Sequence, residues 1–205
     1  MAERAHPDDP GFQVRKEIVW LKGIIPWIQI RRSPYREEFF WRYRWVCKFC
    51  KNRDVLDIPC GMGWGTSLLK GCHKLFGVDI NPDAIEEASY RYSRHANFLI
   101  SDMGNLGFKD RIFDVVVCLE GIEHVSPTIG KNFIAETARI LRPNGMFFLS
   151  SPHCRIRNHS GNPYHIKEYK PEELNALLEP YFKVINSINH DVDIVTVAYI
   201  QGKLR

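Results

Sequence analysis

The stretch Val55-Leu-Asp-Ile-Pro-Cys-Gly-Met-Gly-Trp-Gly65 decides the fold class of this chain. Its apolar start predicts a short strand over residues 54–58. The glycines that follow, Gly61, Gly63 and Gly65, predict a tight turn whose backbone can approach a ligand closely. A strand that runs into a glycine-rich turn is typical of an α/β sheet with a ligand at its edge.

Strand and helix patterns alternate through the rest of the chain. Alternation at this spacing predicts a Rossmann-like, doubly wound seven-stranded sheet, mostly parallel with a C-terminal antiparallel hairpin. We expect strands at 75–79, 97–100, 113–119 and 146–150, helices at 66–70, 82–92, 129–141 and 171–178, and a hairpin from 182–188 and 194–200.

The N-terminal quarter differs in charge from the rest. Residues 1–53 hold twelve Lys/Arg and six Asp/Glu, a net charge of +6, whereas residues 54–205 hold sixteen and eighteen, a net charge of −2. We predict helices at 12–30 and 35–50. Residues 1–50 would form a helical cap, not an independent domain, on a domain at 51–205. A peripheral membrane contact through residues 12–50 is the alternative to simple packing.

Three acidic residues lie at or just after the carboxyl ends of predicted strands and indicate the ligand chemistry. Asp57 precedes the glycines, where a carboxylate suits a cationic ligand and would repel a diphosphate. Asp79 ends the second strand about twenty residues on, where an acid can hydrogen-bond ribose hydroxyls. Asp102 follows the third strand, where it can accept from an adenine amino group while Met103 covers the ring.

These motifs, taken in order, carry a resemblance to a known family. VLDIPCGMGWGT, GVDINPDAI, FLISDM, FDVVVCLEGIEHV and ILRPNGMFFLSSP resemble the five motifs of class I (Rossmann-like) S-adenosylmethionine-dependent methyltransferases, over residues 42–200. Pro59 stands where the family usually has Gly or Ala. The resemblance implies S-adenosylmethionine as cofactor and S-adenosylhomocysteine as product. It implies a cofactor site at Asp57, Pro59, Gly61, Gly63, Asp79, Ile80, Asp102, Met103 and Leu119.

Transfer of a methyl group to a hydroxyl needs a base close to the methyl. Glu120, Glu123 and His124 follow the fourth strand, and ligands bind at the carboxyl ends of such strands. His165 lies in the long polar segment after the fifth strand. We predict His124, His165 and Glu120 as catalytic residues and no metal ligand.

NPYHIKEYKPEEL resembles a block of methyltransferases that modify sugars and small molecules. The predicted acceptor is therefore a hydroxyl of a sugar, glycolipid or other small molecule.

Three alternatives remain open from the sequence. Glu120, Glu123, His124 and either His165 or His159 resemble the Mg²⁺ or Mn²⁺ site of small-RNA 3′-terminal ribose 2′-O-methyltransferases, with the basic N-terminal region on RNA phosphates. A catalytically inactive S-adenosylmethionine-binding protein is the second alternative. A nicotinamide-dependent oxidoreductase is the third, and Asp57 disfavours it.

The cysteines and the N-terminus bear on compartment and metal content. Cys118, one of six cysteines, lies in an apolar strand-like run, as a buried intracellular thiol would. The polar start of the sequence does not resemble a signal peptide. Together they predict a cytoplasmic protein. Cys47 and Cys50 have zinc-like spacing, but a structural zinc site needs four ligands, and no second pair with that spacing follows. The sequence makes no prediction of oligomeric state.

Overall fold

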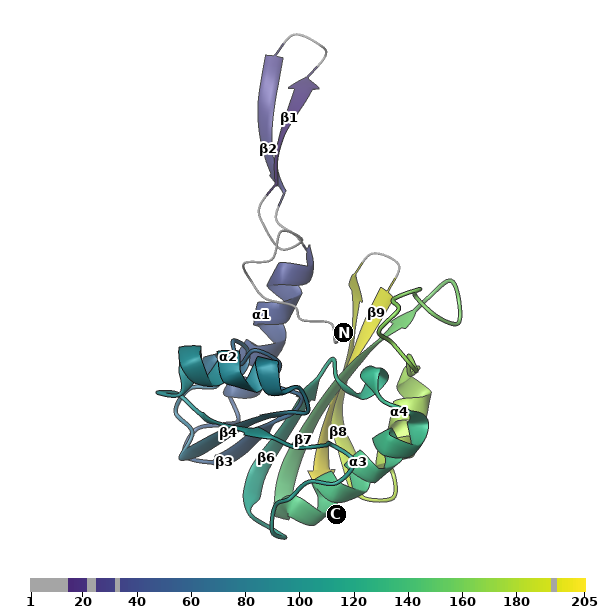
Figure 1. Ribbon diagram of the computed structural model, residues 1–205. Helices are drawn as coiled ribbons and strands as arrows, with labels where there is room; N and C mark the ends of the chain where they lie inside the picture. Colours follow the sequence, from purple (N-terminus) through teal and green to yellow (C-terminus); the bar gives the residue numbers. More distant parts are fainter. Residues whose placement is uncertain (1–14, 22–24, 32–33, 193–194) are drawn as a thin grey trace.

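The computed structural model describes residues 15–21, 25–31, 34–192 and 195–205. Its main body is a seven-stranded sheet in the order β5-β4-β3-β6-β7-β9-β8 (Figure 1). The strands from β5 to β7 pair in parallel, and β9 pairs antiparallel with both β7 and β8. The predicted Rossmann-like sheet with an antiparallel C-terminal hairpin is therefore confirmed.

The secondary structure elements follow the sequence pattern closely from residue 34 onward. The helices are α1 (Pro34–Cys47), α2 (Pro82–Tyr92), α3 (Pro127–Ile140) and α4 (Pro171–Leu178), with short 3-10 turns η2 (Thr66–Leu68) and η3 (Ile122–His124). The strands of the main sheet are β3 (Asp54–Asp57), β4 (Lys74–Asp79), β5 (Asn97–Ile100), β6 (Phe113–Leu119), β7 (Leu141–Cys154), β8 (Phe182–Val192) and β9 (Val195–Leu204).

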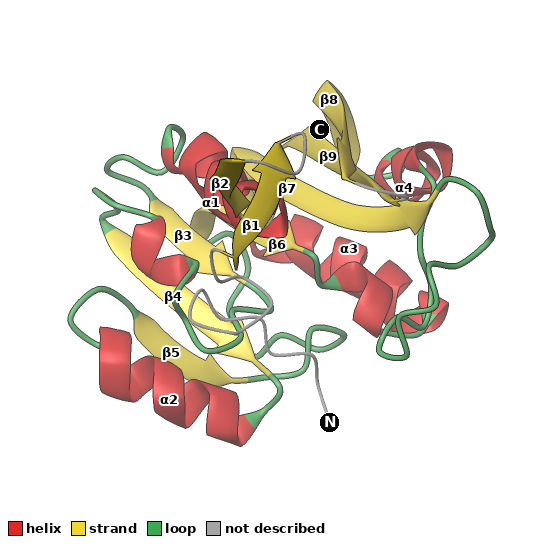
Figure 2. Cartoon of the chain, turned by 90° about the horizontal axis from the view of Figure 1, so that it is seen from above, coloured by secondary structure: helices red, strands yellow, loops and turns green. Residues whose placement is uncertain are grey.

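Both faces of the central strands are buried, as the continuous apolar run of β6 predicts. Because side chains alternate along a strand, Val115 and Val117 lie in the core on the α1 side, and Val116 and Cys118 lie in the core beneath α3 and α4. Figure 2 shows α1 on one side of the sheet and α3 and α4 on the other. The two cores fix the sheet between layers of helices.

The order of the strands positions the site. Chain order reverses between β3 and β6, which lie side by side in parallel. Ligands of open α/β sheets bind at such a reversal, beyond the carboxyl ends of the strands. Asp57 ends β3, and Glu120 follows β6. The main candidate residues therefore meet at one edge of the sheet.

The helix predicted over residues 12–30 is wrong. Two antiparallel strands occupy this segment instead, β1 (Arg15–Leu21) and β2 (Ile25–Arg31). The segment is rich in Ile, Val and Trp, which favour strands, and Pro26 would remove a hydrogen bond from a helix interior. Only the second half of the predicted helical cap, α1, is a helix. The parts of the 12–30 prediction at 12–14 and 22–24 lie outside the described residues.

Two other predicted elements differ from the structure, and both strands of the C-terminal hairpin end four residues later than expected. The helix expected over 66–70 is only the 3-10 turn η2, since the run between Gly65 and Gly71 is too short to nucleate an α-helix. The strand expected over 146–150 extends to residues 141–154, because its whole second half pairs with β9. No helix in the described part of the chain has both the length and the apolar composition required to cross a bilayer.

Gly65 joins α1 to the glycine-rich turn. Its backbone is in the right-handed helical region (φ −64°), so any residue could adopt its conformation. A Cβ atom at Gly65 would, however, lie 2.3 Å from the Tyr43 ring. Gly65 is therefore required by the packing of α1 and not by the turn itself.

We predict that Gly65→Ala destabilises the protein by about 1–3 kcal/mol, the usual cost of overpacking a core. The added methyl would displace the Tyr43 ring. Gly107→Ala is the matched control, because a Cβ atom there meets nothing within 4 Å. Chemical unfolding measures both variants. Equal stability of the two would contradict the packing role, and Tyr43→Leu in the Gly65→Ala background should restore part of the loss.

Candidate functional site

Asp57 is a fully buried carboxylate at the end of β3. It accepts a hydrogen bond of 2.6 Å from the Thr66 hydroxyl and one of 3.3 Å from the Tyr43 hydroxyl. Burial raises the pKa of Asp57 to about 7, although both hydroxyls and the charge of Arg42 act to lower it. A carboxylate with so high a pKa gains most from a cationic ligand.

Asp79 ends β4 and faces the same turn. Its carboxylate accepts the backbone N–H groups of Gly61 and Asn81, each at 2.9 Å. This pair of bonds fixes the carboxylate at the mouth of the turn. Ile80, the next residue, is 64% exposed.

The glycine-rich turn combines tight and open positions. Gly61 and Gly63 both have positive φ angles, 52° and 77°. A Cβ atom at Gly63 would lie 2.8 Å from Ala88 and from Phe98, whereas one at Gly61 would meet nothing within 4 Å. Gly63 is therefore needed for packing, and the space beside Gly61 is open to a ligand.

Four further predicted cofactor residues end or follow the strands β3, β5 and β6. Pro59 follows β3, and a Cβ atom at Gly121 would lie 2.2 Å from its ring. Leu119 and Met103 are buried. Asp102 is exposed, and its carboxylate accepts the backbone N–H of Gly104 at 2.8 Å.

Arg42 of α1 is a buried cation that joins the two halves of the site. Its guanidinium lies 3.8 Å from the Glu120 carboxylate, and its side chain is 4% exposed. Glu120 has a positive φ of 54° and accepts a hydrogen bond of 2.7 Å from the Ser150 hydroxyl. The Glu120 backbone N–H donates to the same hydroxyl at 3.1 Å. Glu120 is therefore held by Ser150 and Arg42.

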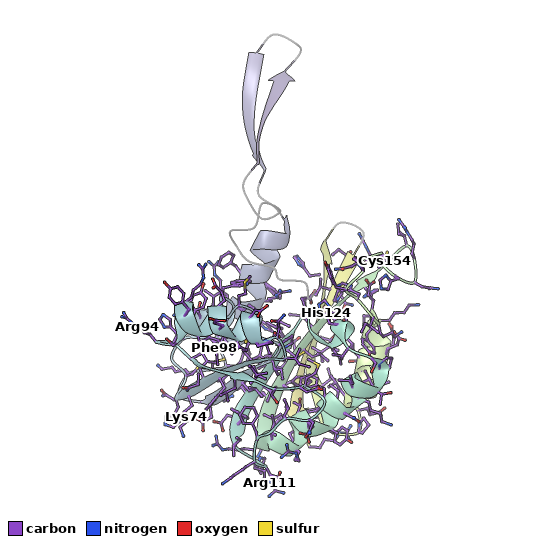
Figure 3. The ribbon with its side chains drawn as sticks, in the orientation of Figure 1. Lys74, Arg94, Phe98, Arg111, His124 and Cys154 are labelled. Atoms are coloured by element: carbon purple, nitrogen blue, oxygen red, sulfur yellow. The ribbon has the colours of Figure 1, made fainter. Side chains whose placement is uncertain are left out.

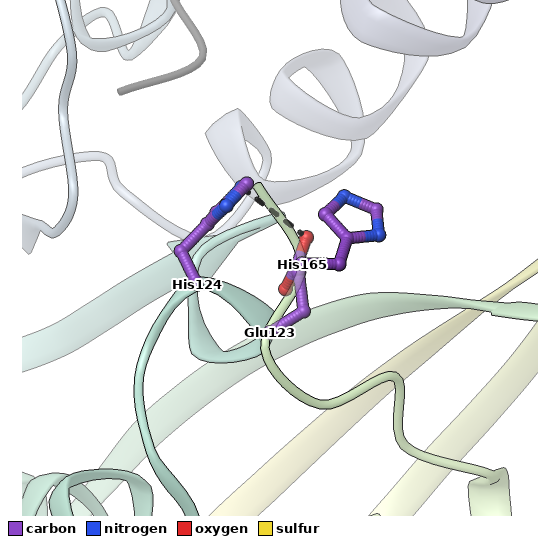
Figure 4. Close-up of side chains that lie close together, drawn as sticks. All are labelled: Glu123, His124 and His165. Carbon is purple, nitrogen blue, oxygen red and sulfur yellow. Dashed lines mark ion pairs between the residues drawn. The ribbon is translucent and has the colours of Figure 1, made fainter. Parts of the chain in front are cut away.

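Glu123 is the most unusual residue of the site. It is completely buried, and neither carboxylate oxygen has a hydrogen-bond partner among the described residues. Nε2 of His124 lies 3.9 Å from one of its carboxylate oxygens (Figure 4), and the two form an ion pair only when His124 is protonated. Burial, and then the charge of Glu120, raise its pKa well above the ordinary value. A buried carboxylate left without hydrogen bonds is costly and calls for an explanation.

His124 and His165 meet beside Glu123, although 40 residues separate them in the chain. Their rings are T-shaped with centroids 5.1 Å apart. His124 Nδ1 is 3.0 Å from the Tyr164 carbonyl, and His165 Nδ1 is 2.7 Å from the Glu168 carboxylate. Since a carbonyl and a carboxylate can only accept, each ring carries its proton on Nδ1 and presents an unprotonated Nε2 when neutral. Nε2 of His165 lies 3.1 Å from the Asn162 side-chain amide.

Glu168 organises the segment that carries His165. Besides His165, its carboxylate accepts the backbone N–H groups of Cys154 and Ser160 and the Ser160 hydroxyl. Burial acts to raise the pKa of Glu168, but the hydrogen bonds from Ser160 and His165 outweigh it and hold the pKa below the usual range. The backbone N–H groups of Ile166 and Lys167 also donate to the Glu123 carbonyl, which ties this segment to η3.

The structure brings together most, but not all, of the predicted catalytic set. Within the described residues, one group of three potential ligands for a metal ion is found, and it consists of Glu123, His124 and His165. Glu120 is not part of it. Neither is His159, whose Nε2 lies 3.0 Å from the His165 carbonyl. The described cysteines, Cys47 and Cys50 included, are all free thiols.

Several functional contacts escaped the sequence analysis. Thr66 and Ser150 hold carboxylates of the site, and Asn162 and Ser160 arrange the His165 segment. Thr66 directly follows the glycine-rich turn and could have been found there. Ser150, Asn162 and Ser160 each bond to a residue 3 to 30 positions away in the sequence, and no local pattern marks these pairs.

Comparison with known proteins agrees with the observed fold. The family described as "Methyltransferase domain" matches residues 55–145. A probable S-adenosylmethionine-dependent methyltransferase of Mycolicibacterium smegmatis is 32% identical over 172 residues, which cover 78% of this chain and 65% of the relative. A phthiotriol/phenolphthiotriol dimycocerosates methyltransferase of Mycobacterium tuberculosis is 36% identical over 100 residues, 47% of this chain and 36% of the relative.

This chain thus spans less than two thirds of the length of these relatives. Among solved structures, the N-methyltransferase NodS of Bradyrhizobium japonicum, in complex with S-adenosylhomocysteine, has a TM-score of 0.70 at 20% identity. The match covers 83% of this chain and 88% of NodS. The chain carries a methyltransferase domain with the class I, Rossmann-like fold, and it is related to the S-adenosylmethionine-dependent methyltransferases.

Proposed function

We propose that this protein transfers a methyl group from S-adenosylmethionine to a hydroxyl of a sugar, a glycolipid or another lipid-linked small molecule. The observation that supports it best is the buried Asp57 carboxylate beside the open space at Gly61, with the His124–His165 pair beyond the neighbouring strand. A relative named for methylation of a phthiotriol dimycocerosate supports a lipid acceptor.

The residues of the turn fit the cofactor. The Asp57 carboxylate would bind the ammonium group of its methionine part, and Asp79 would accept from the ribose hydroxyls. Exposed Ile80 and buried Met103 would cover the adenine, and Asp102 would accept from its amino group. When bound, the cofactor supplies an activated sulfonium methyl, so the protein needs only to align, desolvate and deprotonate the acceptor.

Arg42 is the residue best placed to bind the carboxylate of the methionine part. It is buried, it comes from the same helix turn as Tyr43, and its charge acts directly on the pKa of Asp57. Arg42 and Asp57 together would then bind both charges of the amino acid.

His124 is the residue that we assign as the base. Its Nδ1–H bond to the Tyr164 carbonyl leaves Nε2 able to accept the acceptor hydroxyl proton, and its side chain is 28% exposed, compared with 9% for His165. His165, oriented by Glu168, would hold the acceptor beside it. His124 would take the proton of the acceptor hydroxyl, and the cofactor, when bound, would supply the methyl group to the acceptor oxygen and leave as S-adenosylhomocysteine.

We predict that S-adenosylmethionine binding depends on pH through Asp57. Because the cationic ligand binds the ionised carboxylate, affinity should fall about tenfold for each pH unit below about 7 and level off above it. Calorimetric titration between pH 5.5 and 8 measures it. Asp57→Asn should bind weakly at every pH. Asp79→Asn is the comparison: because the Asp79 charge helps to raise the pKa of Asp57, this variant should weaken binding and move the midpoint to lower pH while the pH dependence remains. A pH dependence in Asp57→Asn like that of the parent would refute the assignment.

We predict that His124→Gln lowers kcat by about 10² or more, the usual contribution of a general base, with unchanged affinity for S-adenosylhomocysteine. His165→Gln should lower kcat by roughly tenfold and raise KM, because His165 positions the acceptor. A panel of sugar, glycolipid and lipid hydroxyl acceptors with radiolabelled cofactor provides the assay. If His165→Gln loses more turnover than His124→Gln, the two roles are reversed.

A second candidate function is metal-assisted methylation of an RNA ribose hydroxyl. The grouping of Glu123, His124 and His165 favours it, since two imidazoles and one carboxylate can bind a transition metal ion and leave positions open for an acceptor. Each His also hydrogen-bonds a backbone carbonyl or a carboxylate through its other nitrogen, as metal-binding histidines do.

The second function predicts that the cofactor-free protein binds Mn²⁺ tightly. Electron paramagnetic resonance measures this binding. Glu123→Gln should abolish binding. Glu120→Gln is the matched control, because Glu120 lies outside the cluster and should leave Mn²⁺ binding intact. Turnover that is unaffected by chelators, and weak Mn²⁺ binding, would exclude the metal-assisted reaction.

A further inference from the structure

The strands β1 and β2 form a ribbon that stands away from the main sheet (Figure 1). We call residues Arg15–Leu21 and Ile25–Arg31 the N-terminal ribbon. All seven positions of each strand pair with the other strand, from Arg15 opposite Arg31 to Leu21 opposite Ile25. A two-stranded ribbon is at most marginally stable in water on its own, so a further surface that covers it would stabilise it.

The register divides the N-terminal ribbon into two halves of different chemistry. The four pairs nearer the turn are apolar at all eight positions: Ile18–Ile28, Val19–Trp27, Trp20–Pro26 and Leu21–Ile25. The three pairs nearer the main body are Arg15–Arg31, Lys16–Ile30 and Glu17–Gln29, with three cations and one acid. The outer half is thus uncharged, and the inner half is basic.

Both faces of the outer half are apolar. Neighbouring residues of a strand belong to opposite faces, so the pairs Ile18–Ile28 and Trp20–Pro26 share one face and Val19–Trp27 and Leu21–Ile25 share the other. A ribbon that packs on a protein body needs one apolar face and leaves the other polar. Two apolar faces with cations behind them suit an environment that is apolar around the tip and anionic at the base.

We propose that the N-terminal ribbon docks this protein on an anionic lipid bilayer. Its outer half would lie at the boundary of headgroups and acyl chains, and Arg15, Lys16 and Arg31 would lie beside the lipid phosphates. Trp20 and Trp27 are of the residue type that favours this boundary. The inference rests on the proposed function in one respect, because docking would bring a lipid acceptor to the site.

The position of the site agrees with such docking. His124 follows β6, and Cys154 ends β7. Figure 3 shows both residues on the side of the main sheet that faces the N-terminal ribbon. The loop beyond Cys154 has two isoleucines, Ile156 and Ile166, exposed by 66% and 61%.

Charge favours a bilayer over a second copy of the chain. Pairing two such ribbons in the same direction would also cover the apolar outer halves, but it would bring two sets of three cations together. Like charges disfavour self-association, whereas attraction to an anionic membrane surface contributes about 1 kcal/mol of binding free energy for each Lys or Arg near it.

Sedimentation with large vesicles tests the proposal on the full chain. Binding to vesicles of phosphatidylcholine with 30% phosphatidylglycerol should be at least tenfold tighter than to phosphatidylcholine alone. The double variant Trp20→Glu/Trp27→Glu should lose at least tenfold. Ile185→Glu is the control, because Ile185 is an exposed isoleucine of β8 outside the ribbon, and it should bind as the parent does.

Three results would overturn the proposal. They are absent vesicle binding by the parent, equal binding by the double variant, and a dimer in light scattering that the double variant abolishes. S-adenosylhomocysteine affinity of the double variant should stay at the parent value, which shows that the site has folded. Vesicle binding with no methylated lipid acceptor would refute the proposed function alone, and methylation of a soluble acceptor without vesicle binding would refute docking alone.

Discussion

The burial of the Asp57 carboxylate is the constraint on which the site depends. Its two hydroxyl partners come from different places: Thr66 from the turn after β3, and Tyr43 from α1, outside the matched domain. One carboxylate therefore couples the strand, the glycine-rich turn and the N-terminal helix. Gly65 permits this coupling, since only a residue without a side chain lets the Tyr43 ring lie against the turn. The high pKa of Asp57 results from its burial, which the two hydroxyls and the Arg42 charge offset only in part.

The sequence predicted the fold wherever local and tertiary preferences agree. The bounds of α2, β5, β6 and α4 match the expected ones, because capping residues, prolines and apolar runs mark them directly. The prediction failed over residues 12–30, where aromatic and β-branched residues compete with a helical spacing of apolar positions. There, periodicity alone did not distinguish a ribbon from a helix, and strand propensity decided the outcome.

The two halves of the site were not equally predictable. Asp57, Gly61 and Asp79 sit at strand ends and turns, whose positions follow from the fold, and the structure places them together. The grouping of His124 with His165 depends on Glu168 and on the bonds from Ile166 and Lys167 to the Glu123 carbonyl. These contacts are made by an irregular loop, so only the residue types, and not their pairing, could be read from the sequence.

Glu123 indicates what the acceptor half lacks. Folding a carboxylate into a fully buried position without hydrogen bonds is unfavourable, and natural proteins retain such groups chiefly where function needs them. The neighbouring elements α1, η3 and the His165 loop are each well tied by their own contacts, so the cost is not the result of loose packing. A bound hydroxyl, which can donate to a carboxylate, or a cation, which can be coordinated by it, would each offset that cost. In either case, the lack of hydrogen bonds to Glu123 supports the proposal that the acceptor binds beside His124, at the reversal of the sheet.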